Sequence, residues 1–245
     1  MTVAIDPVTG FPSGGGLFPI EGVRLRVLDG VHPFDRDHRA AAALNWEAEI
    51  AGNPALFDGR MVFQHRLALQ DGIVCGEGYV VPYSTFLWWR RQPEGEGGFH
   101  LFGFPVIASA DGALIAVTMA AHTANPGQVY CAAGSLDTDD IVDGYCDLAG
   151  NMRREVREET GLDLDEATTD GRLFAGYANR RLTIVRLFRF DVSADTLLER
   201  IAAHMEVDEE KEIAEAIAIR SPDPTAHAYN APMLRVLDWF FAEPR

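Results

Sequence analysis

The positions of apolar side chains along the chain predict a mixture of strands and helices. Short segments rich in apolar residues, bounded by Gly, Pro, Asn or Asp, indicate strands. These segments are residues 22–28, 61–69, 73–81, 99–108, 114–119, 128–133, 172–177, 182–192 and 216–220. The segments with helical spacing are residues 35–50, 147–161, 193–205 and 232–241. Two strands are separated only by Asp71-Gly72, which is typical of a tight hairpin turn. Interleaved strands and helices favour an α/β layered fold.

A polar, Gly-rich segment at residues 91–98 is the expected boundary between two parts of the chain. We predict an N-terminal α+β extension at residues 1–98, with strands, one helix and a hairpin, and an α/β domain at residues 99–245. The first 20 residues, rich in Gly and Pro, are expected to form a loose lead-in. The extension would suit either a dimer contact or a lid over a pocket, which leaves a homodimer open.

The helix expected at residues 147–161 carries acidic side chains on its apolar side. Its apolar stripe consists of Leu148, Met152 and Val156. At about 100° per residue, Glu159 falls inside this stripe, Glu155 lies at its edge, and Glu158 lies to the other side of Glu155. A carboxylate that faces an apolar interior is costly unless a cation meets it. These acids therefore indicate a site for a hard divalent cation such as Mg²⁺, which prefers oxygen ligands.

The alternative for this segment is a solvated acidic helix in which Arg154 pairs with Glu158 at i,i+4. The sequence string favours the metal site. Residues 154–162 read Arg-Glu-Val-Arg-Glu-Glu-Thr-Gly-Leu. They match every fixed position in the second half of the Nudix box, written G-x5-E-x7-R-E-U-x-E-E-x-G-U with U aliphatic. On this string the chain resembles the Nudix hydrolases. The resemblance implies an α/β/α sandwich around a mixed sheet over residues 99–245.

The first half of the box departs from the family pattern. Cys146 stands where the family has glutamate, and Asp140 stands at the expected glycine position. Gly134 is a better counterpart for that glycine, and it makes the box six residues longer than usual. The Asp-rich insertion is expected to be a loop, because added loop length is tolerated thermodynamically. Asp147 is expected to be the helix N-cap, and Asp140 or Asp143 could act on a metal through water.

The resemblance implies Mg²⁺-dependent hydrolysis of a diphosphate linkage in a nucleoside diphosphate derivative. The products would be a nucleoside monophosphate and a phosphorylated second product; Mn²⁺ is an alternative metal. The implied metal ligands are Glu155, Glu158, Glu159 and the carbonyl of Gly134. Arg154 would hold a glutamate in place, and Glu155 would be a candidate base. A further acid is expected downstream, with Glu212 as first choice and Glu209 as second; the alternative there is a solvated charge run.

Fewer residues bear on substrate choice. The candidates for substrate contacts are Arg180, Arg181, Tyr177 and His122, and each could instead be structural. Two short strings, at residues 53–59 and 83–87, are similar to the lead-in of Nudix enzymes that cleave UDP-glucose and UDP-galactose. A UDP-sugar is therefore the leading substrate, although both strings could simply form a hairpin and a turn. The alternative is that the chain is a catalytically weak or inactive Nudix-fold protein with a nucleotide-binding or regulatory role.

Composition narrows the function classes. The 245 residues carry a formal net charge of −16 with a pI near 4.7, so sequence-independent nucleic-acid binding is not expected. An anionic small-molecule substrate would then need a metal and local arginines. The three cysteines show no metal-binding spacing, and with no recognisable signal peptide they indicate a reducing cytoplasm. No apolar run approaches the length of a membrane span.

Overall fold

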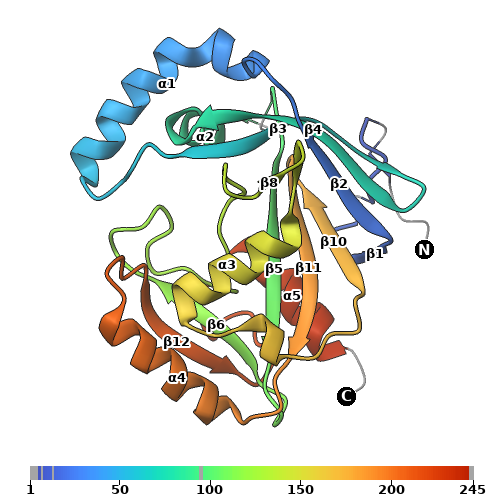
Figure 1. Cartoon of the computed structure of the whole chain (residues 1–245), viewed down its shortest axis with the longest axis vertical. Helices are drawn as coiled ribbons and strands as arrows, with labels where there is room; N and C mark the ends of the chain where they lie inside the picture. Colours follow the sequence, from blue (N-terminus) through green and yellow to red (C-terminus); the bar gives the residue numbers. More distant parts are fainter. Residues whose placement is uncertain (1–4, 7, 13, 94–95, 243–245) are drawn as a thin grey trace.

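The computed structural model describes residues 5–6, 8–12, 14–93 and 96–242, which form two mixed sheets and five helices (Figure 1). The helices are α1 (Pro33–Gly52), α2 (Tyr83–Arg90), α3 (Leu148–Thr160), α4 (Ala194–Val207) and α5 (Ala231–Ala242). The predicted helices are therefore confirmed, and α2 is one that the apolar pattern did not indicate. None of the described helices has the length and apolar character needed to cross a membrane.

The larger sheet contains seven strands in the order β1-β10-β11-β5-β6-β12, with β7 paired to β6. The strands are β1 (Phe18–Ile20), β5 (His100–Ala108), β6 (Leu114–Met119), β7 (Val129–Tyr130), β10 (Leu173–Ala178), β11 (Arg181–Arg189) and β12 (Ile213–Ile219). Strands β11 and β5 are parallel and the other pairs are antiparallel. The predicted α/β class with a mixed sheet is confirmed.

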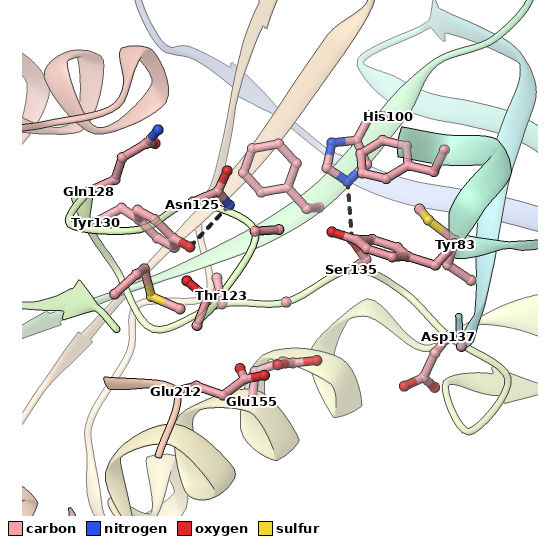
Figure 2. A pocket seen from close by; sticks show the side chains of 18 of the residues that line it. Tyr83, His100, Thr123, Asn125, Gln128, Tyr130, Ser135, Asp137, Glu155 and Glu212 are labelled. Carbon is pink, nitrogen blue, oxygen red and sulfur yellow. Dashed lines mark hydrogen bonds between the residues drawn. The ribbon is translucent and has the colours of Figure 1, made fainter. Parts of the chain in front are cut away.

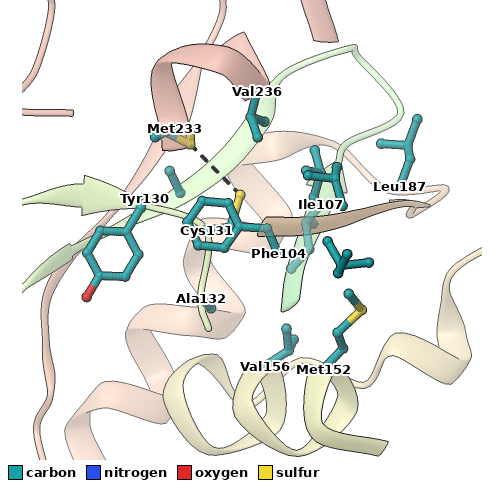
Figure 3. Packing of buried hydrophobic residues seen from close by; sticks show 14 of the residues in the cluster. Phe104, Ile107, Tyr130, Cys131, Ala132, Met152, Val156, Leu187, Met233 and Val236 are labelled. Atoms are coloured by element: carbon teal, nitrogen blue, oxygen red, sulfur yellow. Dashed lines mark hydrogen bonds between the residues drawn. The ribbon is translucent and has the colours of Figure 1, made fainter. Parts of the chain in front are cut away.

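Helices α3 and α5 cover opposite faces of this sheet. Figure 3 shows Met152 and Val156 of α3 on one side of the strand layer, and Met233 and Val236 of α5 on the other. All four side chains are buried in one continuous apolar core. The sheet is thus a layer between helices, and α3 is anchored along its whole apolar stripe. Because α3 is packed against the sheet, its acidic residues have a fixed position relative to the strands.

The smaller sheet has the order β3-β4-β2-β9-β8, with β2 parallel to β4. Its strands are β2 (Gly22–Val27), β3 (Arg60–Gln70), β4 (Ile73–Pro82), β8 (Ile141–Val142) and β9 (Tyr145–Cys146). The predicted hairpin is confirmed, because β3 and β4 pair from Arg60↔Pro82 to Gln70↔Ile73. Its turn residues, Asp71 and Gly72, both have positive φ, as a two-residue hairpin turn requires.

Two expectations were wrong. The Asp-rich insertion is not simply a loop: β8 and β9 form a small hairpin that adds to the smaller sheet. Its turn is Asp143-Gly144 with φ of 51° and 78°, the same turn signal that marks the first hairpin. The lead-in is not loose throughout either, because β1 pairs with β10 and Phe11 is fully buried. The apolar residues of this segment gain more from burial than the Gly-rich context suggests.

Both sheets contain strands from each side of residue 98. Strand β1 belongs to the larger sheet, whereas β8 and β9 belong to the smaller one. The boundary segment at residues 91–98 connects α2 to β5, and two of its residues, 94 and 95, lie outside the described part of the chain. The division into residues 1–98 and 99–245 stays a prediction. The strand pairings nevertheless tie the extension to the rest of the chain at two places.

Candidate active site

Helix α3 is fixed at both ends by local hydrogen bonds and at its middle by close packing. Asp147 caps its N-terminus, since a carboxylate oxygen accepts from the Gly150 N–H at 2.9 Å. Gly161 ends it in the left-handed conformation with φ of 69°. At Gly103 of β5, an added Cβ would lie 2.9 Å from Met152, so only glycine allows this approach. Both predicted caps are confirmed.

The acids of α3 face the directions expected from helical spacing. Glu159 is only 6% exposed and the side chain of Glu155 is 12% exposed, whereas that of Glu158 is 55% exposed. Burial raises the pKa of Glu155 to about 7, against the opposing effect of Arg154. Burial, and then Glu155 and Glu212, raise the pKa of Glu159 well above its usual value. One oxygen of Glu159, Oε2, is buried without any hydrogen-bond partner.

Arg154 forms ion pairs with four carboxylates near the acidic face of α3. Its Nη2 atom lies 2.9 Å from Glu155 Oε1 and 3.0 Å from Asp140 Oδ2, and its Nη1 atom lies 2.9 Å from Glu158 Oε2. Asp137 lies 3.1 Å from the same Nη2 atom. Asp140 is buried and holds the guanidinium in place, so the inserted segment supplies two of the four carboxylates around one arginine.

Gly134 lies directly against Glu155. A Cβ built at Gly134 would be 2.3 Å from Glu155 Oε2, a distance that forces the carboxylate to move. The segment that follows β7 therefore brings its backbone onto the acidic face of α3. The N–H of the preceding residue, Ala133, stabilises the charged form of Glu159 and partly offsets its burial. This close approach favours glycine at position 134.

A cavity of about 590 Å³ opens next to these acids. It is lined by Glu155, Glu159, Gly134 and His122, and also by Glu212 from the loop before β12. In Figure 2, Glu155 and Glu212 approach the same side of the cavity from α3 and from the β12 segment. Burial raises the pKa of Glu212, with a further contribution from Glu210. Glu209, the second choice for a downstream acid, does not line the cavity.

The cavity has a second wall, made largely by the N-terminal extension. Tyr83, Phe86 and Arg90 of α2 line it, together with His100 of β5 and Arg181 of β11. The Nε2 atom of His100 lies 3.3 Å from the Ser135 hydroxyl (Figure 2). Burial, and then the two arginines, lower the pKa of His100 to about 3, so its ring is neutral at ordinary pH. His100 was missed by the sequence analysis, since only the strand pairing brings it to the site.

The two strings at residues 53–59 and 83–87 adjoin in space. Asp58 accepts hydrogen bonds from the N–H and the hydroxyl of Ser84, at 2.7 and 3.0 Å, and so fixes the start of α2. Asn53 donates to the carbonyl of His122 at 2.6 Å, on the far side of the cavity mouth. The extension is thereby attached to the loop that carries His122.

Four predicted site residues do not line the cavity: Arg154, Glu158, Tyr177 and Arg180. Glu158 points to solvent and pairs with Arg154. Tyr177 is buried, with its ring 4.9 Å from that of Phe11 and its hydroxyl 3.4 Å from Asp6. Arg180 lies over the ring of Phe99 and lines a different cavity, while the next residue, Arg181, lines the first one. Arg180 belongs to the turn before β11 and has a left-handed backbone, whereas Arg181 is the first residue of the strand, so the two side chains leave the chain in different directions.

The carboxylate oxygens near the cavity suit a hard divalent cation, although they are not already arranged around a common point as metal ligands would be. Among the residues that the structure describes, no group of three or more His, Cys, Asp or Glu is arranged to hold a metal ion. Four carboxylates nevertheless line one cavity, those of Asp137, Glu155, Glu159 and Glu212, and a buried oxygen of Glu159 is unpartnered. Such a group is costly unless a cation or a proton neutralises it. Cys146 is half-buried and burial raises the pKa of its thiol to about 12, so the thiol carries no charge at ordinary pH.

Comparisons with known proteins gave structural likenesses only. No protein-family model matches the chain, and no curated protein matches its sequence. Among solved structures, it is similar to a Caenorhabditis elegans Ap4A hydrolase binary complex, at 16% identity over 58% of this chain and 96% of that one, with a TM-score of 0.43. It is also similar to a MutT protein from Methanosarcina mazei Go1, at 18% identity over 59% and 96% of the two chains, with a TM-score of 0.38.

A third likeness is to RenU, a Nudix hydrolase from M. smegmatis, at 12% identity over 60% of this chain and 88% of that one, with a TM-score of 0.39. At these identities and TM-scores, a likeness does not decide an activity or a substrate. The chemistry must be argued from the residues around the cavity.

Proposed function

We propose that this protein is a Nudix-type pyrophosphatase, which hydrolyses a diphosphate linkage in a nucleoside diphosphate derivative with the help of Mg²⁺. One observation carries the proposal. Glu159 is buried beside the cavity with an unpartnered oxygen, next to Glu155 and within the electrostatic reach of Glu212. A carboxyl group buried in this way needs a cation or a proton to neutralise it, and with other carboxylates beside the same cavity a cation is the partner that we propose. The string at residues 154–162 supplies these acids in the order of the Nudix box.

The residues that would hold the metal are Glu155 and Glu159, with the Gly134 carbonyl as a backbone ligand. Mn²⁺ is an alternative to Mg²⁺. When bound, the metal would neutralise phosphate charge and lower the pKa of a water molecule. Glu212 would add a fourth oxygen donor or accept a proton from water. Glu158 would join only if its side chain turned away from Arg154.

The reaction consumes one water molecule. Its oxygen forms a bond to one phosphorus, and the bridging P–O bond to that phosphorus breaks. One proton of the water passes to a carboxylate base and the other to the leaving phosphate oxygen or to solvent. Arg154 orients Glu155 through the 2.9 Å ion pair, with Asp140 holding the guanidinium from the other side. The aromatic wall of α2 limits access of bulk water to this side of the cavity.

The leading substrate remains a UDP-sugar. Its support is the pair of short strings at residues 53–59 and 83–87, which adjoin through Asp58 and Ser84 and form part of the cavity wall. The second candidate function is a nucleotide-binding or regulatory protein without turnover. Cys146 in place of a glutamate favours that candidate, because the usual acid at this position is lacking.

The test is turnover with a nucleotide panel in the presence of Mg²⁺. The panel contains UDP-glucose, ADP-ribose, NADH, dinucleoside polyphosphates, coenzyme A and nucleoside triphosphates, with products separated by chromatography. Wild type and Glu155→Gln are compared, and Glu209→Gln serves as the control because Glu209 is an acid outside the cavity. Release of UMP and glucose 1-phosphate by wild type and by the control, but not by Glu155→Gln, supports the proposal. Mg²⁺-dependent binding without turnover of any nucleotide supports the regulatory candidate instead.

A further inference from the structure

Two groups of charged residues face the cavity, besides Asp137 and Arg60, which also line it. In the first group, Glu155 and Glu212 both raise the pKa of Glu159. In the second group, at the other wall, burial and the neighbouring Arg90 lower the pKa of Arg181. The cavity therefore has an acidic wall with these three glutamates and a cationic wall with these two arginines.

Two of the arginines that line the cavity, Arg90 and Arg181, lack acidic partners among the described residues. Arg90 donates to the neutral amide of Asn125 at 3.0 Å, and its guanidinium lies 6.0 Å from the ring centroid of Phe86. Arg181 lies 5.1 Å from the ring of Trp89, and its Nη1 donates to the Asn179 carbonyl at 3.4 Å. Both side chains are half-buried.

Arg91, which follows Arg90 at the end of α2, differs from the two cavity arginines in having an acidic partner. Arg91 is exposed and pairs with Glu49 at 2.6 Å. An arginine at the surface is thus paired, whereas two arginines inside the cavity are not. Two cations held near each other in a partly desolvated place repel, and an anion between them would relieve this repulsion. A guanidinium also matches the planar geometry of a carboxylate or phosphate.

The space between the two walls is lined by aromatic rings. These rings are Tyr83, Phe86, Phe102, Phe104 and Tyr130. Flat apolar surfaces of this kind suit the face of a sugar ring or a base. A ligand that spans the cavity would thus meet carboxylates at one end, rings along its length, and two guanidinium groups at the other end.

We propose that the substrate carries a second anionic group, a carboxylate or a phosphate, which Arg90 and Arg181 bind while the diphosphate lies at the acidic wall. This inference rests on the proposed pyrophosphatase function and narrows its substrate class. Among nucleotide sugars it selects one with an acidic sugar over one with a neutral sugar. An uncharged hexose would leave both guanidinium groups desolvated and without an anion.

The experiment uses two matched substrate pairs. UDP-glucuronate and UDP-glucose differ only by a carboxylate in place of a hydroxymethyl group, and NADPH and NADH differ only by one phosphate. With Mg²⁺, kcat/KM for the more anionic member of at least one pair is expected to be on the order of ten- to a hundredfold higher, because a hydrogen-bonded ion pair has about that effect. In Arg181→Gln and Arg90→Gln this preference collapses toward unity. The matched control Arg91→Gln keeps it.

The same pairs are titrated calorimetrically against the Glu155→Gln variant, which reads the anion preference without turnover. Circular dichroism of every variant confirms that it is folded. Turnover of both members of each pair at equal kcat/KM, or a preference that survives both arginine substitutions, overturns the inference and leaves the pyrophosphatase proposal standing. A preference in binding without any turnover upholds the anion site and overturns the pyrophosphatase proposal. Absence of both binding and turnover overturns both.

Discussion

Arg154, which pairs with the acids of α3, and Arg181, which lines the cavity, are both half-buried arginines, yet their surroundings are opposite. Arg154 lies within 3.1 Å of four carboxylates, two from α3 and two from the inserted hairpin segment. Arg181 lies against the ring of Trp89, donates to the Asn179 carbonyl and has another cation, Arg90, nearby, with no acidic partner among the described residues. Arg154, whose partners all belong to the protein, holds those side chains in position. A cation without such partners is free to meet a ligand. The difference separates a positioning arginine from a binding one.

The largest expected effect breaks the acidic wall itself. Glu155→Gln keeps the shape of the side chain but removes the charge that would hold a metal and also the partner of Arg154. We expect kcat to fall by about 10²- to 10³-fold, the usual effect of losing one electrostatic catalytic group. The variant should also lose the rise in melting temperature that Mg²⁺ gives to the wild type. Differential scanning fluorimetry with and without Mg²⁺ measures this, and an unchanged rise would argue against a metal at Glu155.

Removing the shared cation tests the comparison directly. Arg154→Met leaves Asp140 buried with no counter-charge and Glu155 without its ion pair. Breaking a buried pair in this way costs roughly 3 kcal/mol of unfolding free energy. Arg181→Gln should change that free energy by no more than about 0.5 kcal/mol, because it removes no ion pair. Urea titrations of both variants measure the difference, and equal losses would contradict the comparison.

Gly134→Ala sharpens the comparison by moving one acid without changing any charge. The added Cβ would lie 2.3 Å from Glu155 Oε2, so the carboxylate must shift. A displacement of about 1 Å at a catalytic group costs on the order of 10²-fold in rate. Gly52→Ala is the matched control, because nothing lies within 4 Å of its Cβ. Steady-state kinetics of both variants measure the effect. A wild-type kcat in Gly134→Ala would show that the Glu155 carboxylate is not displaced or that its position is not critical.

His32 shows a third way of burying an ionisable group, by keeping it neutral. Its ring is fully buried, and Nδ1 accepts from the Phe34 N–H at 3.0 Å as the N-cap of α1. Burial, followed by the repulsion of His65, lowers the pKa of His32 to about 4. The unfolded chain therefore binds the proton more readily, so stability is complete above about pH 6.5 and is lost as pH falls toward 4.

This linkage amounts to about 2 kcal/mol of unfolding free energy between pH 7 and pH 5. His32→Asn keeps an N-cap acceptor but cannot titrate, so its pH dependence should be flatter than that of the wild type. Urea unfolding at pH 7, 6 and 5 provides the comparison. If the unfolding free energies of the two proteins fell equally between pH 7 and pH 5, another group would be responsible for the loss of stability in acid.

Local patterns predicted those parts of the site that lie on one helix. The inward direction of Glu159, the outward direction of Glu158 and both caps of α3 follow from a 3.6-residue period and from Asp147 and Gly161. The β8–β9 hairpin was missed, although Asp143-Gly144 carries the same signal as the turn that was recognised. A motif-based interpretation of the insertion as a loop took precedence over that local signal.

The cationic wall could not be predicted, because it depends on pairings between distant segments. His100 and Arg181 are partners in the parallel pairing of β5 and β11, and Arg90 arrives from a helix that the apolar pattern did not reveal. That Tyr177 and Arg180 do not line the cavity could not be predicted for a related reason. The sequence shows that neighbouring strand residues face opposite sides, but it does not show which side faces the cavity.

The turn between β10 and β11 has exactly two residues, Asn179 and Arg180, both in the left-handed conformation. Because Arg180 serves one cavity and Arg181 the other, the length of this turn decides which guanidinium each cavity receives. An insertion or deletion of a single residue there would shift the strand by one position and exchange the two faces. Natural variants of this protein should therefore tolerate substitutions in the turn more readily than changes in its length.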